Sequence, residues 1–149
     1  MSSIKVKMSL MYALVLLLPA LAFGQTVNLK PYNLTATAMF LQTDTDLSGD
    51  IDRPELDASF RDYDTDRNGR VSRTEYMTYL SIHTPSLAAL HDALFDIYDV
   101  DNDHILDHHD YDNFFGLMDG NGDGFVSHFE YVRYWTILLQ DLEHLHLDN

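Results

Sequence analysis

Four stretches of this sequence place oxygen-bearing side chains at the same intervals. In the clearest, DTDRNGRVSRTE at residues 64–75, acidic, amide or hydroxyl side chains stand at the first, third, fifth, ninth and twelfth places. The spacing recurs in DTDLSGDIDRPE at 44–55, DVDNDHILDHHD at 99–110 and DGNGDGFVSHFE at 119–130. Calcium takes six to eight oxygen ligands at about 2.3–2.6 Å, which a tightly wrapped chain can supply. The spacing therefore predicts four cation-binding loops, which we number 1 to 4 along the chain.

The other places in each loop also suit a chain that wraps tightly around a cation. The sixth is glycine in three of the loops, which fits a turn at positive φ. The seventh is expected to offer only its backbone carbonyl, so its side chain is free to vary, as Arg70 and Phe125 show. The eighth is always apolar and is expected to face the core beside a partner loop. These apolar residues are Ile51, Val71, Leu106 and Val126.

These features resemble the calcium-binding loops of the EF-hand family, over roughly residues 36–140. The resemblance implies helix–loop–helix units that bind Ca²⁺, with the seventh place acting through its carbonyl and the ninth directly or through a water. In loop 1 the implied metal ligands are Asp44, Asp46, Ser48, Asp50, Asp52 and Glu55. In loop 2 they are Asp64, Asp66, Asn68, Arg70, Ser72 and Glu75. In loop 4 they are Asp119, Asn121, Asp123, Phe125, Ser127 and Glu130.

Loop 3 departs from the family pattern at two places. His104 replaces the glycine, where a side chain at positive φ costs about 1–2 kcal/mol of strain. Asp110 replaces the closing glutamate and is one methylene shorter, so closing the site with both oxygens is harder. We expect weak calcium binding or a preference for the smaller Mg²⁺, and the alternative is a loop kept only for its packing. Its implied ligands are Asp99, Asp101, Asp103, Ile105, Asp107 and Asp110.

The four loops belong to a duplicated module. Residues 36–80 align with residues 91–135 at a constant offset of 55. Within each module the two loops begin 20 residues apart, so one short helix must leave the first loop and enter the second. We therefore predict an all-α fold of EF-hand helix–loop–helix repeats, with four loops from a 55-residue duplicated module and short shared helices.

The sequence leaves the pairing of the loops open. Loops 2 and 3 begin 35 residues apart, close to the usual spacing in paired EF-hands. Either each module is a compact pair that shares its helix, or loops 2 and 3 form the ordinary pair with loops 1 and 4 outside it. Duplication favours the first arrangement and spacing the second, and we prefer the pairing of loops 2 and 3.

The N-terminus has the order of a secretory signal peptide. Lys5 and Lys7 precede an apolar run from Leu10 to Phe23, which is shorter than the roughly 18–20 residues of a membrane anchor and contains Pro19. We predict a signal peptide at 1–24 and an extracellular protein without a membrane span after cleavage. The divisions that follow are an N-terminal extension at 25–35, module 1 at 36–83 and module 2 at 86–145.

Asn33 begins the sequence Asn-Leu-Thr, an acceptor for N-glycosylation. In a secreted protein it is a candidate for that modification. The alternatives are a chance occurrence, or a role for Asn33 or Thr35 in capping a helix.

The net charge of the chain limits the classes of partner that it is expected to bind. The formal net charge is −15, and removing residues 1–24 takes away two lysines and no acid, which leaves −17. Such a charge argues against nucleic acid, which is bound through basic residues, and favours cations, basic surfaces or mineral. The chain has no cysteine, so disulfides cannot stabilise it and bound metal is an alternative source of stability.

No catalytic constellation is present, because the sequence has no cysteine, no serine in a nucleophile motif and no phosphate loop. We therefore predict that the protein is not an enzyme. The expected function is secreted calcium binding for extracellular calcium handling or for association with a mineral or matrix. The alternative is a calcium-dependent module that offers its aromatic and leucine-rich C-terminal helix, about residues 128–145, to a protein partner.

Overall fold

The computed structural model describes residues 28–83 and 85–147, and the signal peptide predicted at 1–24 lies outside them. Helices joined by loops account for most of these residues. The elements are α2 (Tyr32–Thr43), β1 (Asp50–Ile51), α3 (Arg53–Phe60), β2 (Val71–Ser72), α4 (Arg73–His83), η1 (Pro85–Leu87), α5 (Ala88–Tyr98), β3 (Ile105–Leu106), α6 (His108–Met118), β4 (Val126–Ser127), α7 (His128–Asp141) and α8 (His144–Leu147). No helix in the described residues combines the length and the apolar composition needed to cross a membrane.

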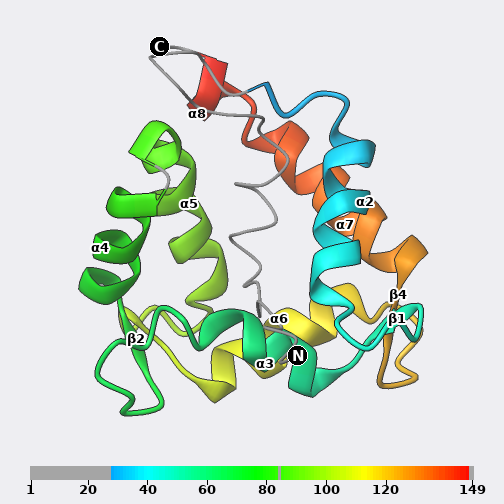
Figure 1. Ribbon diagram of the computed structural model, residues 1–149, viewed down its shortest axis with the longest axis horizontal. Helices are drawn as coiled ribbons and strands as arrows, with labels where there is room; N and C mark the ends of the chain where they lie inside the picture. The colour runs from blue at the N-terminus through cyan, green and yellow to red at the C-terminus, as the bar shows by residue number, and fades with distance from the viewer. Residues whose placement is uncertain (1–27, 84, 148–149) are drawn as a thin grey trace, which may run out of the picture.

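The predicted all-α fold with shared helices is confirmed. Helix α3 leaves loop 1 and enters loop 2, and α6 does the same between loops 3 and 4 (Figure 1). The helix expected at 128–145 is divided, because α7 ends at Asp141 and α8 begins at His144.

The ninth and twelfth places of a loop also begin the helix that follows it. Asp52 accepts a hydrogen bond from the Glu55 amide at 2.9 Å, and the Glu55 carboxylate accepts one from the Asp52 amide at 3.1 Å. This reciprocal capping box satisfies backbone donors that the first turn leaves unpaired. Helices α6 and α7 begin with the same arrangement. Loop closure and helix initiation therefore use the same side chains.

The loops pair across the two modules. Strand β2 pairs antiparallel with β3, so loops 2 and 3 lie together as we preferred. Strand β1 pairs antiparallel with β4, with Ile51 opposite Val126. The expectation that loops 1 and 4 stand outside the pair is wrong, because these two loops form a second pair. Neither module pairs its own two loops.

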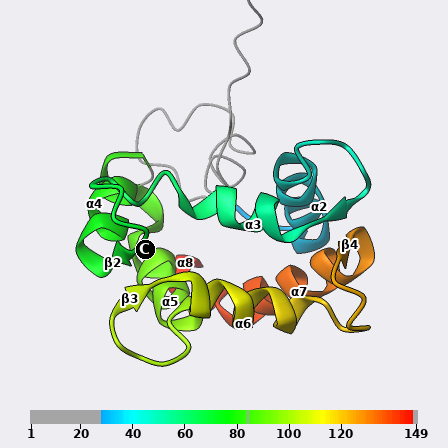
Figure 2. The same ribbon diagram turned by 90° about the horizontal axis from the view of Figure 1, so that it is seen from below.

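The helices follow the same cross-module arrangement. Helix α2 packs on α7, α4 on α5, and α3 on α6. At the offset of 55 residues, α2, α3 and α4 of module 1 correspond to α5, α6 and α7 of module 2. The three helix contacts therefore stay the same when the two modules are exchanged. The two modules thus contact each other through corresponding pairs of helices. Figure 2 shows the shared helices α3 and α6 lying alongside each other, between the α4–α5 pair and the α2–α7 pair.

The core is formed jointly by both modules. All four eighth-place residues are at most 1 % exposed, as the sequence predicted. Phe60 of α3 stacks on Tyr111 of α6 at 4.3 Å between ring centroids and meets Tyr98 edge-on at 5.3 Å. The aromatic stripe of α7 belongs to this core, because Tyr131 and Trp135 are buried.

Candidate metal centre

The first-place aspartate organises every loop in the same way. One carboxylate oxygen accepts the amide of the fifth residue and the other accepts the amide of the sixth, at 2.9–3.2 Å in all four loops. A carboxylate that accepts two backbone bonds fixes the path of the chain around itself. The wrap expected from the spacing is therefore present in the chain itself. The aspartates are Asp44, Asp64, Asp99 and Asp119.

The wrap needs positive φ at two places in each loop. The sixth-place residues have φ of 93°, 82°, 66° and 86°, as the sequence predicted. The fourth-place residues have φ of 62°, 60°, 60° and 72°, which the sequence reasoning missed. In loops 3 and 4 the fourth place is Asn102 and Gly122, two residue types that favour this region, whereas Leu47 and Arg67 gave no such signal.

In loops 1 and 2 the closing glutamate returns to the start of the loop. Glu55 accepts the Thr45 amide at 2.6 Å and the Asp46 amide at 3.2 Å. Carboxylate oxygens of Asp44, Asp46 and Glu55 consequently lie within 4.8 Å of one another. Such a cluster places three anionic oxygens within reach of a single cation. The corresponding cluster in loop 2 is Asp64, Asp66 and Glu75.

Hydrogen bonds of Ser48 connect the third, fifth and seventh places of loop 1. The Ser48 hydroxyl donates to the seventh-place carbonyl, that of Asp50, at 2.8 Å. The Ser48 amide donates to Asp46 at 2.9 Å. The structure therefore brings together the first, third, fifth, seventh and twelfth places, and the ninth-place Asp52 lies beside them as the cap of α3.

Hydrogen bonding lowers the pKa of the closing carboxylates in loops 2 and 4. In loop 2 the Ser72 amide, donating at 3.0 Å, is the main cause that lowers the pKa of Glu75 to about 2. In loop 4 the Ser127 hydroxyl and amide are the main causes that lower the pKa of Glu130. Both groups are thus held in the anionic form that a divalent cation requires.

Loop 4 has an uncharged side chain at its third place, where each of the other three loops has an aspartate. Its third place is Asn121, whose side-chain amide donates to Asp123 at 3.0 Å. Glu130 closes the loop by accepting the Gly120 amide at 3.0 Å and the Asn121 amide at 3.2 Å. Asp119, Asp123 and Glu130 are the acids of this loop, but among the described residues only loops 1, 2 and 3 bring three carboxylates within 4.8 Å of one another.

Loop 3 keeps the wrap but closes differently. Asp110 accepts the Val100 amide and the Asp107 amide, both at 2.9 Å, so it joins the same two ends of the loop as a glutamate does. The acidic cluster here consists of Asp99, Asp101 and Asp103, whereas in loops 1 and 2 it includes the closing carboxylate. Burial is the main cause that raises the pKa of Asp110, which is 2 % exposed. Weaker binding at loop 3 stays a prediction.

The strain expected at His104 is present, since its φ is 66°. We predict that His104→Gly stabilises the metal-free protein by about 0.5–1 kcal/mol, because removing about 1–2 kcal/mol of strain outweighs the extra chain entropy of glycine. Thermal unfolding in a chelator measures this. The matched control is Gly49→His at the equivalent place of module 1, where φ is 93° and no atom lies within 4 Å of an added Cβ. Gly49→His should lower the stability of the metal-free protein, and a gain in stability in this variant would contradict the strain argument.

Asn33 is exposed in the first turn of α2. The N-cap of this helix is Pro31 and makes no side-chain cap, so neither Asn33 nor Thr35 caps it. The Thr35 hydroxyl donates instead to the Leu29 carbonyl at 2.7 Å. Glycosylation at Asn33 stays a prediction.

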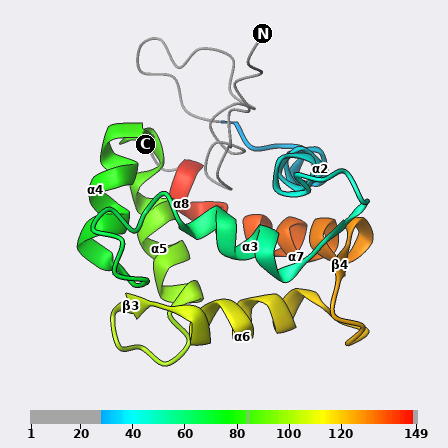
Figure 3. The same ribbon diagram turned by 60° about the horizontal axis from the view of Figure 1, so that its bottom comes forward.

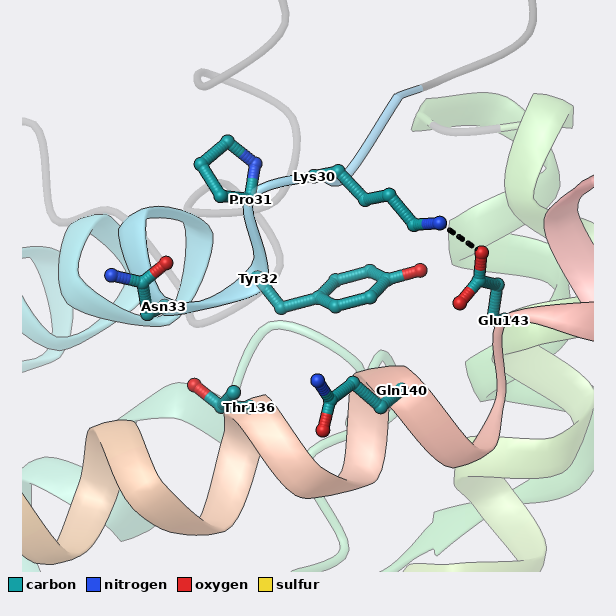
Figure 4. Close-up of a pocket in the computed structure, with 7 residues that line it drawn as sticks. All are labelled: Lys30, Pro31, Tyr32, Asn33, Thr136, Gln140 and Glu143. Atoms are coloured by element: carbon teal, nitrogen blue, oxygen red, sulfur yellow. Dashed lines mark ion pairs between the residues drawn. The ribbon is translucent and has the colours of Figure 1, made fainter.

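A shallow pocket lies at the opposite end of the α2–α7 pair from the loops. Figure 4 shows the Lys30 ammonium group pointing to the Glu143 carboxylate, with which it forms an ion pair. Tyr32 lies beneath this pair, and Thr136 and Gln140 of α7 form the floor. The pair ties the segment before α2 to the segment after α7. Its lining contains a single acid, so it does not resemble the loops as a cation site.

Comparison with known proteins identifies part of this architecture. A family model described as EF hand matches residues 56–81 and 111–133. The matches run from α3 through loop 2 into α4, and from α6 through loop 4 into α7, so the chain contains an EF-hand at two sites. Loops 1 and 3 precede the matched segments, and their assignment depends on spacing and geometry. No curated protein and no solved structure matches the chain.

Proposed function

We propose that this protein is a secreted calcium-binding protein, with Ca²⁺ bound at loops 1, 2 and 4 and more weakly at loop 3, where Mg²⁺ competes. The observation that carries this proposal is the wrap repeated in all four loops, with each first-place carboxylate fixed by two amides. Loops of this kind supply six to eight oxygens to Ca²⁺. The bound ion supplies positive charge, and the side chains supply the oxygens and their orientation.

The proposed use of the binding is extracellular calcium handling or association with a mineral or matrix. The predicted charge of −17 after cleavage supports it, because four divalent ions would offset only eight of those charges. The acidic residues that remain could attract further cations or a basic or mineral surface. Catalysis, nucleic acid and membrane insertion have no place in the proposal.

The test is calorimetric titration of residues 25–149 with Ca²⁺, with Mg²⁺ as the control and circular dichroism on the same samples. We expect three or four sites and a gain of helix as they fill. No heat and no change in helix content up to several millimolar Ca²⁺ would reject the proposal. The acidic surface itself would then become the leading explanation of the sequence.

A calcium-dependent interaction module is the second candidate. It is favoured by large apolar side chains exposed on the α2–α7 pair, namely Leu34, Leu41 and Phe129 at 60 %, 60 % and 73 %. Separate exposed apolar residues are ordinary on protein surfaces, which is why this candidate stands second. A rise in hydrophobic-dye fluorescence when Ca²⁺ is added would favour it. An unchanged signal would favour calcium handling.

A further inference from the structure

Arg70 occupies the seventh place of loop 2, where only the backbone carbonyl is expected to act. In the structure its side chain reaches the neighbouring loop. Its Nη2 lies 3.7 Å from an oxygen of Asp103, and its Nε lies 3.9 Å from an oxygen of Asp107. The pairing of Val71 with Leu106 explains this contact, because it sets residue 70 opposite residue 107.

The two acids that Arg70 contacts are predicted ligands of loop 3, at its fifth and ninth places. Loop 3 carries a carboxylate at all five places where a side chain is expected to act, whereas loop 1 carries four and loops 2 and 4 carry three each. The equivalent of Arg70 in module 2 is Phe125, which the second strand pair sets opposite Asp52 of loop 1. At this position, therefore, loop 3 is opposite an arginine of its partner loop, whereas loop 1 is opposite a phenylalanine of its partner loop.

We propose, on the basis of the proposed function, that Arg70 acts as a positioning residue that weakens divalent-cation binding at loop 3. A guanidinium about 4 Å from two ligand carboxylates attracts them in the metal-free loop and repels an incoming divalent ion. It thereby makes loop 3 the last loop to fill. Arg70 and Asp103 are 51 % and 43 % exposed, so solvent screening limits the effect. The corresponding change in dissociation constant is about two- to fivefold.

The test compares the wild-type protein with Arg70→Gln, which removes the charge and keeps the carbonyl of loop 2. The protein is purified after expression of the full chain and titrated with CaCl₂, then with MgCl₂, by ¹⁵N NMR. The His104 amide reports on loop 3, because it donates to the first-place Asp99 at 3.0 Å. The amides of Gly49, Gly69 and Gly124 report on loops 1, 2 and 4.

In Arg70→Gln we expect the dissociation constant at loop 3 to fall about two- to fivefold at low salt. The difference should shrink in 1 M NaCl, where the screening length is about 3 Å. Arg70→Lys keeps a charge and should stay close to the wild type. Arg133→Gln makes the same change in net charge on the exposed side of α7 and should leave loop 3 unchanged.

Three results would overturn the inference. One is an unchanged or higher dissociation constant at His104 in Arg70→Gln while the three glycine amides still titrate. Another is a His104 amide that does not titrate in either protein although the glycines do. Both leave calcium binding by the other loops intact. Failure of all four amides to titrate in the wild type would overturn the proposed function itself, and this inference with it.

Discussion

Calcium at a hundred times its dissociation constants should raise the melting temperature of residues 25–149 by about 20–30 °C. Each ion bound only to the folded state would add about 2.7 kcal/mol, so three well-formed loops would add about 8 kcal/mol. A change of 1 kcal/mol moves the midpoint by about 4–8 °C for 60–100 residues and by about 2–4 °C for 150–250 residues, so about 3–4 °C is expected for a chain between these sizes. The large effect follows from a chain that has no disulfide and a strong excess of acids. Scanning calorimetry in CaCl₂ and in chelator, at equal ionic strength, measures it.

The control for this prediction keeps the fold and removes the metal ligands. Glu55→Gln, Glu75→Gln and Glu130→Gln together delete three closing carboxylates, and glutamine in the same place can still take part in a capping box. The triple variant should lose most of the calcium-dependent rise. A wild-type rise below about 5 °C, or the same rise in the variant, would mean that calcium does not stabilise the fold through these loops.

The sequence predicted the features that depend on short-range spacing. Buried eighth places, a positive φ at the sixth and shared helices are all set within 12 to 20 residues, so the residue types carry the information. Capping adds to this, because Asp52 and Glu55 begin a helix and close a loop by the same hydrogen bonds.

The features that the sequence did not reveal involve choices between distant segments. Loops 1 and 4 begin 75 residues apart, and strands of two residues carry too little pattern to select a partner. The positive φ of Leu47 and Arg67 was also missed, because the bonds to the first-place aspartate, not the residue type, impose it. The contact of Arg70 with loop 3 follows only once the pairing is known.

The joint core makes Phe60 the most sensitive position between the modules. Phe60 is 2 % exposed, and its ring contacts Tyr98, Tyr111 and Phe114 of the other module. We expect Phe60→Ala to lower the free energy of unfolding by about 3–5 kcal/mol, because it leaves a cavity and removes aromatic pairs that each contribute about 0.5–1.5 kcal/mol. Urea unfolding of the calcium-loaded protein measures the loss.

The matched control is Phe115→Ala, the same substitution at the equivalent place of module 2. Phe115 is 8 % exposed and is not among the ring partners of Phe60, so its loss should be smaller by about 1–3 kcal/mol. Because α3 serves both loop 1 and loop 2, Phe60→Ala should also weaken calcium binding at both loops together. Equal losses in the two variants would show that the modules are stabilised independently, and the contact between α3 and α6 would then be incidental to folding.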